Sequence, residues 1–97
     1  MSTIRARAQV QDGVATVRAL INHRMDIPDF DAGEEGHYIT NVRAESGGRQ
    51  VMNATWGPGI SQNPYLSFRF RGSAGDTLRI TWEDNKGESD SLETELS

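Results

Sequence analysis

The chain has 97 residues, of which fourteen are acidic and ten are basic, so its net charge is −4. This length predicts a single domain over residues 1–97, and the negative charge argues against general binding to nucleic-acid phosphates. The chain holds no cysteine, which excludes disulfides, thiolate metal sites and cysteine nucleophiles.

The N-terminal residues include arginines, but no apolar run follows them, so we expect no signal peptide. No stretch approaches the roughly 18 consecutive apolar residues of a membrane span. The residues alone therefore favour the cytoplasm. A protein that is exported while bound to a partner would have the same features.

Segments in which apolar and polar residues alternate recur along the chain, whereas helical periodicity is poor. Residues 23–36, rich in Asp, Glu, Gly and Pro, are predicted to form a long loop. The Asp12-Gly13 and Gly47-Gly48 pairs predict tight turns. The predicted strands, in chain order, are 4–9, 14–21, 37–45, 50–56, 65–71, 77–83 and 88–96. About seven short strands with frequent turns predict an all-β fold, an antiparallel immunoglobulin-like β-sandwich.

Alternation also predicts which side chains face the core. Trp56 and Trp82 lie at inward positions, which favours a role as core anchors. In segment 65–71 the inward side chains are Leu66, Phe68 and Phe70. In segment 37–45, Tyr38, Thr40, Val42 and Ala44 are predicted to share one face.

The outward face of segment 65–71 carries Tyr65, Arg69 and Arg71, beside a turn stiffened by Pro64. An outward tyrosine in such a place is typical of interfaces, so Tyr65 is a candidate contact residue. The two arginines are predicted to lie on a solvated face. Binding of a small oxyanion is the alternative, because the guanidinium fork matches such oxygens.

Five acidic residues crowd the predicted loop, and His23 and His37 flank it. Oxygen-rich loops bind Ca²⁺, but the spacing does not match an EF-hand, so a solvated loop or a contact for a basic partner is favoured. Two histidines with a carboxylate form a minimal transition-metal set. Neither histidine has a ligand-type partner at i, i+4, so hydrogen-bonded histidines are favoured, and no metal or cofactor is predicted.

No nucleophile elbow or phosphate-binding loop occurs, so the residues favour a binding or scaffolding protein over an enzyme. Three stretches resemble landmarks of the SoxZ family of sulfur-oxidation subunits: LINHRMD (20–26), ISQNPYLSFRF (60–70) and LRITWEDNKG (78–87). The resemblance covers nearly the whole chain.

The resemblance implies an immunoglobulin-like, non-catalytic subunit of the SoxYZ carrier complex of thiosulfate oxidation. Its implied partner is SoxY, whose C-terminal arm carries a cysteine that holds sulfur intermediates, and other Sox enzymes would be reached through the complex. The implied location is the periplasm, reached by export with a partner that has a signal peptide. The residues that we expect in or near the SoxY contact are His23, Met25, Ile60, Asn63 and Tyr65.

Three alternatives stay open. Family members usually have His-Pro-Met where this chain has His23-Arg24-Met25. The first alternative is therefore a related carrier that serves a quinoprotein dehydrogenase. A β-sandwich module that forms homodimers through its edge strands is another. A metal or oxyanion binder that uses His23, His37 and the acidic loop is the third.

Overall fold

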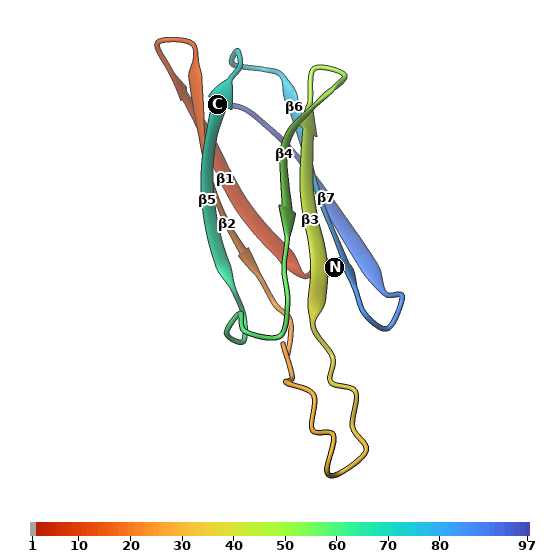
Figure 1. Cartoon of the computed structure of the whole chain (residues 1–97). Coiled ribbons are helices and arrows are strands. Elements are labelled where there is room, and N and C mark those ends of the chain that lie inside the picture. Colours follow the sequence, from red (N-terminus) through yellow and green to blue (C-terminus); the bar gives the residue numbers. More distant parts are fainter. Residues whose placement is uncertain (1) are drawn as a thin grey trace.

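The computed structural model describes residues 2–97 and shows two antiparallel sheets packed face to face (Figure 1). One sheet has the order β1-β2-β5 and the other β4-β3-β6-β7. The strands are β1 (Ile4–Gln11), β2 (Val14–Ile21), β3 (Ile39–Ser46), β4 (Arg49–Thr55), β5 (Tyr65–Arg71), β6 (Thr77–Asp84) and β7 (Ser89–Glu95). The predicted all-β immunoglobulin-like sandwich is confirmed, and no helix occurs among the described residues.

The core lies between the two sheets and follows the alternation of the sequence. In β2 the fully or nearly fully buried side chains are Ala15, Val17, Ala19 and Ile21. In β6, Leu78, Ile80 and Trp82 are buried, as predicted. Trp56 lies just beyond β4 and packs half-buried against this core.

Strand β3 departs from the predicted alternation at its beginning. Ile39 pairs with Asp84 and Asn41 pairs with Glu83, so β3 has one residue more than β6 at this point. This β-bulge shifts the face that the preceding residues present. The predicted shared face therefore holds only for Val42 and Ala44, which are buried. Before the bulge Ile39 is the buried residue, and Tyr38 and Thr40 are half-buried.

Two predicted tight turns are confirmed by their backbone angles. Asp12 and Gly13, between β1 and β2, have φ values of 54° and 75°. Gly47 and Gly48, between β3 and β4, have φ values of 61° and 76°. Positive φ at both central residues is the property of the two-residue turn that matches the twist of a hairpin.

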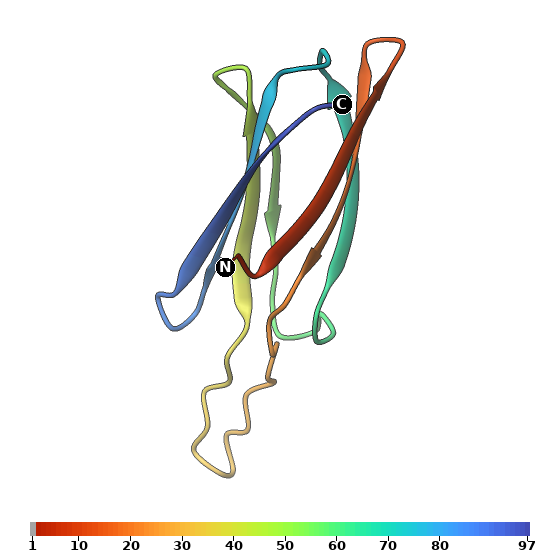
Figure 2. The same ribbon diagram turned by 180° about the vertical axis from the view of Figure 1, so that it is seen from behind.

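The C-terminal end of the chain joins the two sheets along one side. Figure 2 shows the chain after β7 crossing toward β1. The backbone N–H of Val10 donates to the carbonyl of Ser97 at 2.8 Å, and the N–H of Ser97 donates to the carbonyl of Ala8 at 3.1 Å. This side of the sandwich is therefore closed by backbone hydrogen bonds.

Between β2 and β3 the chain leaves the sandwich as a long projecting ribbon, drawn from orange to yellow in Figure 1. Residues 23–36 were predicted to form a loop. They are more regular than that, because the outgoing and returning chains pair with each other at two places. We term residues 24–36 the arm.

Candidate functional site: a projecting arm and its buried root

The arm is held straight by two antiparallel bridges. Asp26 and His37 exchange backbone hydrogen bonds of 2.7 and 3.0 Å, and Asp29 and Glu34 exchange two of 2.8 Å. At the tip, the N–H of Gly33 donates to the carbonyl of Phe30 at 3.2 Å. The arm is therefore a hydrogen-bonded ribbon with a tight turn at its end.

Gly36 allows the two chains of the arm to approach each other closely. Its φ of +80° lies in the left-handed region, and a Cβ there would meet the carbonyl oxygen of Asp26 at 2.7 Å and the nitrogen of Pro28 at 2.8 Å. Real Cβ atoms do not approach backbone that closely, so this position requires glycine.

The arm carries the net charge of the whole molecule. Five of the fourteen acidic residues and one of the ten basic residues lie in it, so it has a charge of −4 and the remainder of the chain is neutral. Two of its apolar side chains are unusually exposed: 71% for Ile27 and 86% for Phe30. A projecting ribbon with an apolar tip among carboxylates has the composition of a contact surface.

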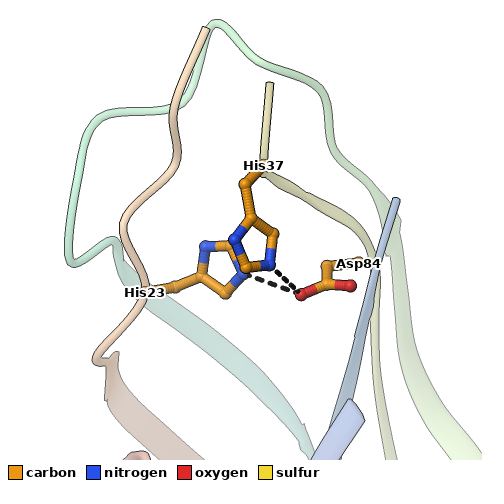
Figure 3. Close-up of side chains that lie close together, drawn as sticks. All are labelled: His23, His37 and Asp84. Atoms are coloured by element: carbon orange, nitrogen blue, oxygen red, sulfur yellow. Dashed lines mark hydrogen bonds and ion pairs between the residues drawn. The ribbon is translucent and has the colours of Figure 1, made fainter. Parts of the chain in front are cut away.

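At its base the arm is fixed to the sandwich by a buried carboxylate. The Oδ2 atom of Asp84, at the end of β6, lies 3.1 Å from Nε2 of His23 and 2.8 Å from Nε2 of His37 (Figure 3). The Asp84 side chain is fully buried, and that of His23 is only 4% exposed. One carboxylate oxygen therefore ties together the residue before the arm and the residue after it.

The other oxygen of Asp84, Oδ1, accepts backbone N–H groups from Lys86 at 3.0 Å and Glu88 at 2.9 Å. Burial alone would raise the pKa of Asp84. The hydrogen bonds from His23, Glu88, His37 and Lys86 outweigh this effect, and they hold the pKa below its ordinary value of 3.8. The carboxylate is thus ionised and fully hydrogen-bonded inside the protein.

The residue types of this cluster also suit a metal ion, since one ligand atom each of His23, His37 and Asp84 lies within 4.8 Å of the others. The ring of His23 argues against it. Its Nδ1 accepts the backbone N–H of Met25 at 3.1 Å, so the ring proton is on Nε2, where it is donated to Asp84. A metal on Nε2 would displace that proton to Nδ1, against the Met25 N–H. The geometry therefore favours hydrogen-bonded histidines.

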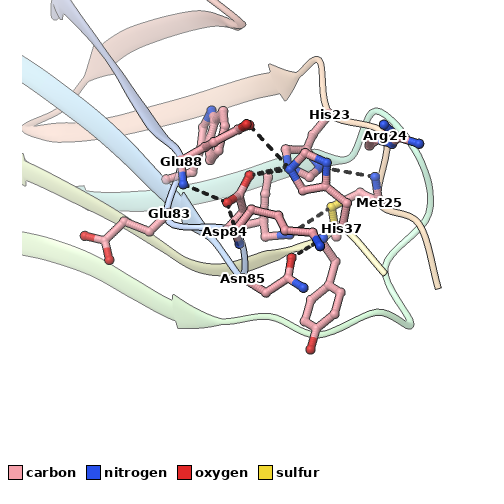
Figure 4. Close-up of polar contacts among 12 residues, drawn as sticks. His23, Arg24, Met25, His37, Glu83, Asp84, Asn85 and Glu88 are labelled. Carbon is pink, nitrogen blue, oxygen red and sulfur yellow. Dashed lines mark hydrogen bonds and ion pairs between the residues drawn. The ribbon is translucent and has the colours of Figure 1, made fainter. Parts of the chain in front are cut away.

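Met25 begins the arm in an unusual backbone conformation. Its φ of 49° is rare for a residue other than glycine, and it persists only where the surroundings fix it. Here its N–H binds the ring of His23, and its buried sulfur accepts the N–H of Ile39 at 3.3 Å (Figure 4). Met25 therefore sets the direction in which the chain leaves the sandwich.

Asn85 fixes the returning chain of the arm. Its side-chain Oδ1 accepts the N–H of Tyr38 at 2.8 Å, and its Nδ2 donates to the carbonyl of Gly36 at 3.2 Å. Its own N–H donates to the carbonyl of Tyr38 at 3.0 Å. Residues 36–38 are thus held in two ways: Asp84 binds the side chain of His37, and Asn85 binds the backbone of Gly36 and Tyr38.

We term His23, Met25, His37, Asp84 and Asn85 the root of the arm. Sequence reasoning named the two histidines but missed Asp84 and Asn85. Their signal was weak, because Asp84 follows the alternation of β6 as one more inward residue, and an inward aspartate at a strand end resembles an ordinary turn residue. Asp84 meets His37 and His23 only in the folded chain, because they are 47 and 61 positions away in the sequence.

The five predicted partner-contact residues lie at different depths. His23 and Met25 are buried, at 6% and 5% exposure. Asn63 is exposed and bonded to the backbone of His23, and Ile60 packs half-buried against the core. Tyr65 is 62% exposed on the outer face of β5. The structure thus places His23, Met25 and Asn63 together, with Tyr65 at the surface.

A comparison with protein families matches residues 4–95 to the model of the sulphur oxidation protein SoxZ. The chain belongs to the SoxZ family. The three stretches that resemble SoxZ landmarks all reach the arm's base: the first supplies His23 and Met25, the second Asn63, and the third Asp84 and Asn85. Each of the three stretches therefore contributes residues that hold the base of the arm.

Membership of the SoxZ family gives the chain a role in sulfur oxidation and association with other components of the Sox system. No curated protein matches the chain. No helix long and apolar enough to cross a membrane occurs among residues 2–97.

Proposed function

We propose that this chain is the non-catalytic subunit of a SoxYZ carrier complex. Its partner is a SoxY-like subunit whose cysteine arm carries the sulfur intermediates of thiosulfate oxidation. The observation that carries the proposal is the family match over residues 4–95 of a chain without cysteine. Because sulfur intermediates are held on a thiol, the carrying thiol has to come from a second protein.

In this role the chain acts as a scaffold that holds and orients its partner. The proposed contact includes Tyr65, which is exposed, and Ile60 and Asn63, which lie in the connection leading to β5. His23 and Met25 are buried, so they contribute by fixing the arm and the Asn63 turn beside it. The complex would function in the periplasm, exported by the signal peptide of the partner.

Co-expression of this chain with a SoxY-like subunit tests the proposal. We expect a 1:1 complex in size-exclusion chromatography, and sulfur adducts on the partner's cysteine by mass spectrometry. A chain that elutes alone refutes the proposal, and one that elutes as a homodimer supports the self-associating module instead.

Charged substitutions test the proposed contact residues. We expect Tyr65→Glu and Ile60→Glu to weaken the complex, whereas Asn53→Glu, at an exposed position of the other sheet opposite Arg43, should leave it unchanged. Circular dichroism of each variant separates loss of contact from loss of folding, which matters for half-buried Ile60. Unchanged affinity in both variants would remove these residues from the interface.

A further inference from the structure

The outer face of the β1-β2-β5 sheet is strongly basic. At alternate positions of the three strands it carries five arginines, and within residues 2–97 no acidic side chain belongs to this face of the strands. These residues, which we term the arginine face, are Arg5, Arg7, Arg18, Arg69 and Arg71. The sequence reasoning noticed only the two on β5, because strand pairing is what brings the other three beside them.

The fold does not use these charges. All five arginines are exposed, and none forms a salt bridge with another residue in the described part of the chain. Arg43, on the other sheet, is by contrast paired with Glu83 at 2.7 Å. Arg7 and Arg18 lie directly opposite each other, and like charges in such pairs destabilise a sheet.

An apolar spot lies within the arginine face. Leu20 is 43% exposed and pairs across the strands with Tyr65 on one side and Arg5 on the other. A shallow depression bordered by these residues and by Arg7 and Arg18 opens there. Tyrosine and arginine around an apolar centre are the residues enriched in protein–protein interfaces.

We propose that the arginine face docks a carboxylate-rich surface of the SoxY-like subunit, with an apolar side chain of that subunit over Leu20 and Tyr65. This inference rests on the proposed function, and it adds the chemistry that the partner must present. Opposite charge across an interface orients the two proteins and speeds their encounter.

The spacing of the arginines favours a protein surface over a small anion. Alternate residues on a strand are about 7 Å apart, and neighbouring strands about 4.8 Å, so the guanidinium groups spread over three strands. A small oxyanion needs donors that converge on one point. Nucleic acid is disfavoured because the −4 arm leaves the same end of the sandwich as Tyr65 and would repel phosphates.

The experiment measures association of this chain with the purified SoxY-like subunit by surface plasmon resonance at several salt concentrations. We expect the association rate of the wild type to fall as salt increases, because salt screens the opposing charges. Arg18→Glu, at the centre of the face, should associate about tenfold more slowly and with less dependence on salt. Asn53→Glu, which adds a glutamate at an exposed position of the other sheet opposite Arg43, is the control and should behave as the wild type.

The outcomes separate this inference from the proposed function. If the wild type does not bind the subunit, both are wrong. If the wild type binds and Arg18→Glu binds at the same rate, only the inference about the face is wrong. The inference is also overturned if the chain alone forms dimers that Arg18→Glu dissociates, or if a DNA duplex displaces the subunit from the wild type, since the face would then serve a second copy or a nucleic acid.

Discussion

His23 and Asn63 hydrogen-bond to each other in both directions. The backbone N–H of His23 donates to the side-chain Oδ1 of Asn63 at 3.2 Å, and the N–H of Asn63 donates to the carbonyl of His23 at 2.9 Å. Asn63 has a φ of 52°, a conformation that asparagine tolerates better than most residues. The connection that leads to β5 is thus locked to the chain just where the arm begins.

Asn63→Ala should lower the free energy of unfolding by about 1–2 kcal/mol, because it removes one hydrogen bond and places alanine in the left-handed region. Urea unfolding followed by tryptophan fluorescence measures this change. Gln62→Ala is the control, since Gln62 is the exposed neighbour in the same turn. Equal losses in the two variants would show that the pairing with His23 contributes nothing.

Asp84→Asn should lower the free energy of unfolding by about 3 kcal/mol at neutral pH, because the histidines and backbone N–H groups would lose a buried charged acceptor. Calorimetric unfolding measures it. Glu83→Gln, at the exposed neighbouring position on β6, should cost less than about 1 kcal/mol. A similar effect of both changes would contradict a special role for the buried carboxylate.

The contribution of Asp84 should also depend on pH. Hydrogen bonds hold its pKa in the folded chain below 3.8, so at acidic pH the unfolded chain binds more protons than the folded one. The stabilisation is therefore complete above the unfolded pKa and lost as the pH falls through the folded pKa. In thermal melts below about pH 4, the difference between wild type and Asp84→Asn should shrink; a constant difference down to the lowest pH would refute this account.

Gly36→Ala should loosen the arm while the sandwich stays folded, because the new Cβ would collide with the backbone of Asp26 and Pro28. Hydrogen exchange should show faster exchange of the Asp26 and His37 amides and unchanged protection in β2 and β6. Gly33→Ala provides the control for backbone angle alone, as Gly33 has a φ of +70° but open space around it. Identical exchange in both variants would rule out the steric explanation.

Two phenylalanines should respond very differently to truncation. Phe70→Ala should cost about 3–4 kcal/mol of stability, because its side chain is 9% exposed and belongs to the core. Phe30→Ala should change stability by less than about 0.5 kcal/mol, since its side chain at the tip of the arm is 86% exposed. Chemical denaturation of both variants checks this, and a large loss in Phe30→Ala would mean that the tip folds back onto the protein.

The fold was largely predictable from local information. The alternation of apolar and polar residues and the residue types of tight turns are properties of a few neighbouring residues. Strands β2, β5 and β6 and the two hairpin turns could therefore be predicted from the printed sequence. The bulge at the start of β3 could not, because it depends on how Ile39 pairs with a strand 45 residues away. Local patterns do not contain that pairing.

The candidate site was only partly predictable for the same reason. His23 and His37 could be singled out by residue type, but their common partner Asp84 is distant in sequence. The arginine face was missed because each strand contributes only one or two of its five arginines. Tyr65 and Arg69 were visible on one segment, whereas Arg7 and Arg18 join them through strand pairing alone.

The unequal placement of charge gives this protein a large electric dipole. The acidic arm projects from one end, and the arginines spread over a sheet face that extends toward the other end. In the field of a charged partner such a molecule turns before the two surfaces touch. On ion-exchange media the same property would let a chain with a net charge of −4 adhere to a cation exchanger as well as to an anion exchanger.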